Sequence, residues 1–176
     1  MGTFLFPDEY YESAYIIPYA KYAKQGYKAV VFDIDNTLVP HNAMHDERSI
    51  ALFERLKELG LKYGFVSNNN EARVREFNRE VRGEYAFKAG KPSALGFNKV
   101  MIKLGTNKEN TLFVGDQIFT DILGANNAKL HSILVNQIDK KEEIQIVLKR
   151  YLEKPVLKLY LRNHGMITED SLTRRK

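Results

Sequence analysis

From residue 28 onward, short apolar runs alternate with amphipathic stretches, and this alternation restricts the fold more than any other feature of the chain. The segment KAVVFDI, residues 28–34, is rich in valine and apolar up to its aspartate, as expected for a central strand covered on both faces. Strands and helices in alternation predict a parallel sheet with right-handed crossovers and helices on both sides. We therefore predict one α/β domain with a doubly wound, Rossmann-like sheet.

The same pattern predicts four further strands and five helices. The strands are expected at 62–67, 85–90, 111–116 and 131–136, and the helices at 46–60, 71–83, 93–105, 117–128 and 140–153. In the first helix, Asp46 is the predicted N-cap and Gly60 the predicted stop.

Length and composition limit the number of domains, the kinds of metal site and the partners that this chain can have. A chain of 176 residues fits one domain, and the absence of cysteine excludes disulfides and thiolate metal sites. His41 and His45 lack a third ligand nearby, so we expect no zinc site. The net charge of +5 favours anionic partners such as phosphates or anionic lipids. No RNA-binding motif is present, so we expect no nucleic-acid partner.

Polar and charged side chains follow the predicted strands at their carboxyl ends, where doubly wound sheets bind ligands. The residues that the sheet would bring to this edge are Asp33, Asp35, Thr37, Ser67, Asn68, Lys91, Asp116 and Asp121.

These residue types suit phosphoryl transfer through a covalent intermediate. A carboxylate that attacks a phosphate meets charge repulsion, which a divalent cation relieves. Asp33 and Asp116 would supply the hard oxygen ligands that Mg²⁺ prefers. Asp35 suits a general acid that protonates the leaving alkoxide. Ser67 and Lys91 would hold the remaining phosphoryl oxygens.

The motifs DIDNT at 33–37 and GDQIFTD at 115–121, together with Ser67 and Lys91, resemble the four motifs of the haloacid dehalogenase (HAD) superfamily of phosphatases. The resemblance covers about residues 28–136 and implies a phosphoric monoester hydrolase. It implies that Asp33 is the nucleophile and Asp35 the acid/base. The Mg²⁺ ligands would be the carboxylates of Asp33 and Asp116 and the main-chain carbonyl of Asp35.

The resemblance also implies roles for the remaining residues of this edge. Asp121 would support the metal and the lysine, and Thr37 matches the position that buttresses the turn after the nucleophile. We assign phosphate binding to Thr37, Ser67, Asn68 and Lys91.

Longer segments are similar to the bacterial YqeG family of subfamily IIIA: DIDNTLVPH, VSNNNEARVREF, AGKP and VGDQIFTDILGANN. That family is related in sequence to the mitochondrial phosphatidylglycerophosphatase. The resemblance therefore implies hydrolysis of phosphatidylglycerophosphate to phosphatidylglycerol.

Structural roles remain open for several of these residues. Ser67 can cap the following helix, Lys91 can be an exposed loop lysine, and Asp121 can lie on a helix surface. Asn68 can satisfy the backbone of a turn instead of binding phosphate.

No insertion after the first or second motif is long enough for an independent lid domain. We therefore predict no cap or a minimal one, and an open active site. An open site would accept a bulky substrate, a membrane-embedded headgroup or a phosphoprotein, or a lid from a second subunit in a homo-oligomer.

The expected domain boundaries leave two flanking segments. Residues 1–27 form an aromatic-rich segment that packs on the core or lies at a membrane interface, residues 28–152 form the HAD-like catalytic domain, and residues 153–176 form a C-terminal extension with a basic tail. No secretory signal or membrane span is evident, so we expect a cytoplasmic enzyme, peripheral at the inner face of the membrane if its substrate is a lipid.

Three other functions remain open. The first is a soluble phosphatase for a nucleotide, a sugar phosphate or a phosphoprotein. The second is a non-catalytic phosphate-responsive or ribosome-associated binding module. A receiver-like signalling domain is the third, although such domains phosphorylate an aspartate on a later strand.

Overall fold

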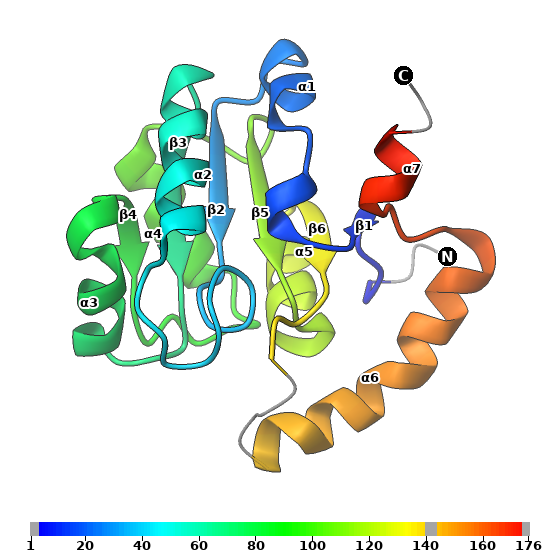
Figure 1. Ribbon diagram of the computed structural model, residues 1–176. Coiled ribbons are helices and arrows are strands. Elements are labelled where there is room, and N and C mark those ends of the chain that lie inside the picture. The colour runs from blue at the N-terminus through cyan, green and yellow to red at the C-terminus, as the bar shows by residue number, and fades with distance from the viewer. Residues whose placement is uncertain (1–3, 140–143, 174–176) are drawn as a thin grey trace.

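The computed structural model describes residues 4–139 and 144–173. Six strands form one sheet in the order β1-β6-β5-β2-β3-β4, and every neighbouring pair is parallel (Figure 1). The strands are β1 (Glu9–Tyr11), β2 (Ala29–Phe32), β3 (Lys62–Val66), β4 (Glu84–Ala86), β5 (Thr111–Gly115) and β6 (His131–Val135). The predicted doubly wound α/β fold is confirmed.

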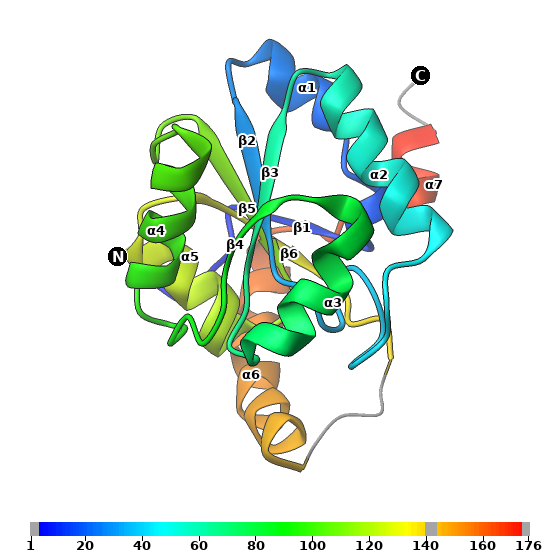
Figure 2. The same cartoon turned by 90° about the vertical axis from the view of Figure 1, so that its left-hand side faces the viewer.

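Helices cover both faces of the sheet (Figure 2). The helical elements are η1 (Ala14–Ile16), α1 (Tyr19–Lys24), α2 (Glu47–Glu58), α3 (Glu71–Val81), α4 (Leu95–Leu104), the π-helix η2 (Ile118–Ile122), α5 (Leu123–Asn127), α6 (Ile144–Asn163) and α7 (Glu169–Thr173).

Side chains alternate between two cores along the central strand. Val30 and Phe32 pack with α1, α2 and α3, whereas Ala29 and Val31 pack with α4 and α5. Because both faces of β2 are buried, its sequence is apolar throughout. Asp46 caps α2 with a capping box through Ser49, as predicted, and Gly60 follows the helix with a φ of +70°.

The N-terminal segment belongs to the core along much of its described length. β1 extends the sheet beside β6, and Tyr11, Tyr19 and Tyr22 are buried. The sequence pattern did not predict this strand.

The C-terminal part also differs from expectation. The helix predicted at 140–153 is observed as α6, which starts at Ile144 and runs through Pro155 to Asn163. It crosses the boundary expected at 152/153 without a break, and residues 140–143 of the predicted helix lie outside the described residues. None of the helices in the described residues is long and apolar enough to cross a membrane.

Candidate active site

Asp33 and Lys91 form a buried ion pair at the carboxyl end of the sheet. Asp33 directly follows β2, and its main-chain N–H donates to the carbonyl of Val114 at 2.9 Å. The Lys91 ammonium donates to Oδ1 of Asp33 at 2.5 Å and to Oδ1 of Asp121 at 2.6 Å. Lys91 therefore lies between two carboxylates and not in an exposed loop, the alternative that its sequence left open.

Asp121 is held by the turn after β5. Its Oδ2 accepts hydrogen bonds from the main-chain N–H groups of Asp116 at 3.1 Å and Gln117 at 3.0 Å. Gly115 permits this approach, because a Cβ at that position would lie 2.6 Å from the Cβ of Asp121. Asp121 is buried and not a surface carboxylate, and it orients Lys91.

Asp116 directly follows β5 and is contacted by two residues from other parts of the chain. The hydroxyl of Thr37 donates to Oδ1 of Asp116 at 2.9 Å. Arg150, on α6, donates to Oδ2 of Asp116 and, at 2.9 Å, to its main-chain carbonyl. Thr37 is buried against this carboxylate, so its side chain is placed to orient Asp116. The sequence pattern did not predict Arg150 as a member of the site.

The charges of this cluster do not balance. Three buried carboxylates, Asp33, Asp116 and Asp121, face two cations, Lys91 and Arg150. Burial raises the pKa of Asp33 well above its usual range, although the ammonium of Lys91 opposes the shift. Burial and the charge of Asp121 likewise raise the pKa of Asp116 to about 6, against the opposing effect of Arg150.

Lys91 stays charged in this environment. Burial alone would lower the pKa of its ammonium, but the charges of Asp121 and Asp33 outweigh burial and raise it.

The carboxylate cluster fits a divalent cation. One oxygen each from Asp33, Asp116 and Asp121 lie within 4.8 Å of one another. Hard oxygen donors with excess negative charge are what such an ion requires, and the ion would stabilise the ionised carboxylates that burial disfavours. This group of potential ligands, found among the described residues, contains neither His41 nor His45.

The carboxylate of Asp35 is not part of that cluster and contacts α3. Its Oδ1 accepts hydrogen bonds from Nη2 of Arg73 at 2.8 Å and from the main-chain N–H of Asn42 at 2.9 Å. The side-chain amide of Asn69 donates to Oδ2 of Asp35 at 3.4 Å. Arg73 is buried in the first turn of α3, and the sequence pattern did not single it out.

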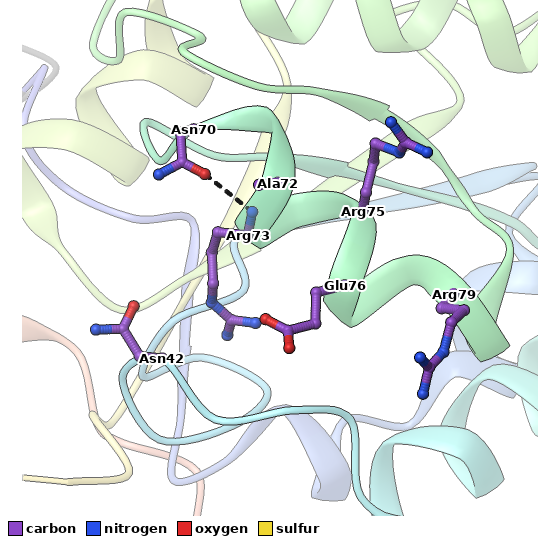
Figure 3. Close-up of a pocket in the computed structure, with 7 residues that line it drawn as sticks. All are labelled: Asn42, Asn70, Ala72, Arg73, Arg75, Glu76 and Arg79. Carbon is purple, nitrogen blue, oxygen red and sulfur yellow. Dashed lines mark hydrogen bonds between the residues drawn. The ribbon is translucent and has the colours of Figure 1, made fainter.

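Arg73 also borders a pocket of about 790 Å³ between α3 and the loop at Asn42, which we call the outer pocket (Figure 3). Its Nη1 is buried and has no hydrogen-bond partner within the described residues. The one guanidinium therefore reaches both Asp35 and the wall of this pocket.

Ser67 and Asn68 follow β3. Asn70, and not Ser67, caps α3, because its side chain accepts from the main-chain N–H of Arg73. The amide of Asn68 accepts from the main-chain N–H of Lys91 at 2.8 Å and donates to its carbonyl at 3.2 Å. Asn68 thus holds the backbone that carries the lysine, the structural use that its sequence left open.

Several of the residues described above line one cavity of about 190 Å³. It is lined by Asp33, Asp35, Asn36, His41, Ser67, Asn68, Asn69, Lys91, Gln117, Thr120, Ile146 and Lys149. Thr37, Asp116 and Asp121 are not part of the lining: Asp121 contacts the lining residue Lys91, and Thr37 contacts Asp116.

The expectation of an open site needs correction. No lid domain is inserted after β2 or β3, as predicted. However, Asp33 is only 6% exposed, and two side chains of α6, Ile146 and Lys149, border the cavity. The cover therefore comes from α6 of the same chain and not from an insertion.

Solved structures show the same fold at low sequence identity. The cobalt-bound deoxy-D-mannose-octulosonate 8-phosphate phosphatase of Haemophilus influenzae is 15% identical with a TM-score of 0.51, over 64% of this chain and 70% of that one. A HAD family hydrolase from Deinococcus radiodurans R1, with bound phosphate and sodium, is 12% identical with a TM-score of 0.51, over 81% of this chain and 91% of that one. Both comparisons support the HAD-like fold.

Sequence comparison goes further. A family model described as HAD-hydrolase-like matches residues 88–147, which include Lys91, Asp116 and Asp121. The "Probable phosphatase YqeG" of Bacillus subtilis is 34% identical over 158 residues, which cover 89% of this chain and 92% of that protein. Because this similarity spans nearly the whole of both chains, the protein belongs to the YqeG-type phosphatases of the HAD superfamily and is a phosphoric monoester hydrolase.

Proposed function

We propose that the protein is a Mg²⁺-dependent phosphohydrolase that forms an aspartyl-phosphate on Asp33. The observation that carries this proposal is the position of Asp33, which lines the cavity together with Lys91 and shares a buried cluster with Lys91, Asp116 and Asp121. Mg²⁺ would be held by the carboxylates of Asp33 and Asp116 and the main-chain carbonyl of Asp35, and it would supply positive charge that reduces the repulsion of the phosphate by the nucleophile.

The proposed reaction has two steps, with Asp33 as the nucleophile and Asp35 as the acid/base. A carboxylate oxygen of Asp33 attacks phosphorus, the bond from phosphorus to the leaving oxygen breaks, and Asp35 donates its proton to that oxygen. Water then attacks the phosphorus of the aspartyl-phosphate and Asp35 takes up the proton of the water, while the bond between phosphorus and the Asp33 oxygen breaks, which frees the carboxylate and inorganic phosphate. Ser67 and Lys91, which line the cavity, bind the phosphoryl oxygens in both steps.

For the substrate we propose phosphatidylglycerophosphate, which the reaction converts to phosphatidylglycerol. The support is the resemblance of the YqeG-type sequence to the mitochondrial phosphatidylglycerophosphatase, together with a net charge of +5 that favours anionic surfaces. The proposed place of the enzyme is the cytoplasm, in peripheral contact with the inner face of the membrane.

The test is phosphate release from phosphatidylglycerophosphate in mixed micelles and from a soluble aryl phosphate, with Mg²⁺ and with EDTA. We expect Asp33→Asn to lower release by at least about 10³-fold, because the nucleophile is lost. Asp170→Asn, which changes an exposed aspartate on α7, is the matched control and should keep full activity.

The outcomes separate the remaining functions. Release from the lipid far above that from the aryl phosphate supports the proposed substrate. Release from the aryl phosphate alone keeps the mechanism and favours a soluble phosphomonoester as substrate. No release from either, regardless of EDTA, contradicts the proposed chemistry and favours a phosphate-binding module.

A further inference from the structure

Helix α6 has two faces with different surroundings. Its inner face packs on the body of the protein: Arg150 binds Asp116, Glu153 accepts a hydrogen bond from the main-chain N–H of Phe119 at 2.8 Å, and Tyr160 is buried beside Phe6. Figures 1 and 2 both show the first turns of α6 at the end of the molecule toward which the strands point. The helix is therefore anchored on one side only.

The outer face of α6 is apolar and exposed, whereas the solvent side of a surface helix is normally polar. Ile144, Leu148, Tyr151 and Leu152 are 85%, 64%, 65% and 60% exposed, and Val147 is also exposed. These positions follow the helical spacing i, i+3/i+4, i+7/i+8 and thus form one continuous stripe, which we call the docking face.

Basic side chains accompany the docking face. Lys154, Lys158 and Arg162 are exposed on the following turns, and the Lys154 ammonium lies 3.9 Å from the centroid of the Tyr151 ring. The single acidic residue between Ile144 and Asn163 is Glu153, which is buried on the inner face. Apolar side chains with tyrosine and lysine on one exposed helix face match the interface of an anionic lipid surface.

A second copy of the chain fits this face less well. A two-fold dimer that paired α6 with its copy would supply no opposite charge to these basic residues, because α6 offers no exposed carboxylate. An anionic surface instead supplies the opposite charge and an apolar layer for the stripe.

The docking face also lies beside the active site. Ile146 and Lys149, on the first turns of α6, line the cavity that contains Asp33. We propose that the docking face holds the protein on an anionic lipid surface, so that a phosphomonoester headgroup in that surface reaches the cavity. This inference deepens the proposed function, since it takes the substrate to be lipid-borne.

A single tryptophan tests the contact directly, because the chain contains none. Tyr151→Trp places the reporter on the docking face, and Ile102→Trp places it on α4 at a site that is 78% exposed. With vesicles that contain phosphatidylglycerol, we expect the emission of the first variant to shift to the blue and that of the second to stay unchanged. Emission at position 151 that matches the lipid-free protein would contradict the proposal.

Flotation with the same vesicles gives an independent test. We expect Ile144→Ser/Leu148→Ser/Leu152→Ser to bind at least about tenfold less than the unchanged protein. Leu95→Ser/Ile102→Ser, two exposed positions on α4, is the matched control and should float as before. Binding should fall as salt is raised and be weak on phosphatidylcholine alone.

Two further measurements separate this proposal from the proposed function. Hydrolysis of a soluble aryl phosphate should be equal in the triple-serine variant and the unchanged protein, which shows that the variant is folded. A protein that floats through α6 but hydrolyses nothing keeps the docking face and contradicts the proposed chemistry. An active protein that does not float contradicts the docking face, as does a dimer in sedimentation that the triple-serine variant abolishes.

Discussion

The contact between Arg73 and Asp35 gives the proposed acid/base a fixed orientation. Two N–H groups of the guanidinium reach the same carboxylate oxygen, at 2.8 and 3.3 Å, and the arginine is itself buried. Such a contact fixes the side chain of Asp35 at the cavity, and Arg73 itself is not among the residues that line it, so we regard Arg73 as a positioning residue.

We expect Arg73→Ala to lower kcat by roughly 10–100-fold with a smaller change in KM, because the proton donor would lose its orientation. Steady-state kinetics measure kcat and KM, and Arg73→Lys should restore part of the rate.

Arg75→Ala is the control for this prediction. Arg75 is an exposed arginine on the same helix and borders the same outer pocket (Figure 3). Equal losses in the two variants, or no recovery of the rate in Arg73→Lys, would argue against the positioning role.

At the scale of elements, α6 is tied to η2 by one buried carboxylate. Burial raises the pKa of Glu153 to about 7, with the charges of Asp121 and Asp116 adding to the shift and Arg150 opposing it. The pKa of this group is therefore higher in the folded chain than its ordinary value of 4.5. Its contribution to stability is fully present below pH 4.5 and is lost as the pH rises through about 7.

We expect Glu153→Gln to remove this pH dependence. The amide oxygen of glutamine can still accept from the N–H of Phe119, but it carries no charge to bury. Urea unfolding at about pH 8 should show the variant more stable by up to ~3 kcal/mol, with a smaller difference at about pH 5. The same loss of stability with pH in both proteins would contradict the assignment to Glu153.

At the scale of the whole molecule, the N-terminal segment completes the sheet and the core. Tyr11 is 1% exposed in β1, and its hydroxyl lies 3.0 Å from a carboxylate oxygen of Glu9 and 3.3 Å from the hydroxyl of Tyr22. β1 also pairs with β6, so segments more than a hundred positions apart in the sequence lie side by side in the sheet.

We expect Tyr11→Ala to destabilise the protein by about 3–5 kcal/mol, the usual cost of truncating a buried aromatic side chain. Phe4→Ala, which truncates a 59% exposed aromatic residue, should change stability by less than about 0.5 kcal/mol. Denaturant unfolding measures both, and equal midpoints for the two variants would show that β1 contributes little to the folded core.

Much of the catalytic end of the molecule could be predicted from local patterns. The strand–helix alternation determined the parallel sheet, and parallel strands place their carboxyl ends at one edge. Asp33, Lys91 and Asp116 each follow a strand directly or within a short loop, so their meeting follows from the order of elements. Their roles in the reaction remain proposals.

Other features were decided only by tertiary structure. Arg73 and Arg150 reach the site across 38 and 34 residues of sequence, and along the chain each looks like an ordinary basic residue of a helix. β1 has three residues, too few to show a period of two. α6 carries apolar side chains on both faces, so its sequence could not tell which face the protein buries. Only the packing of the folded chain separates the buried face from the exposed one.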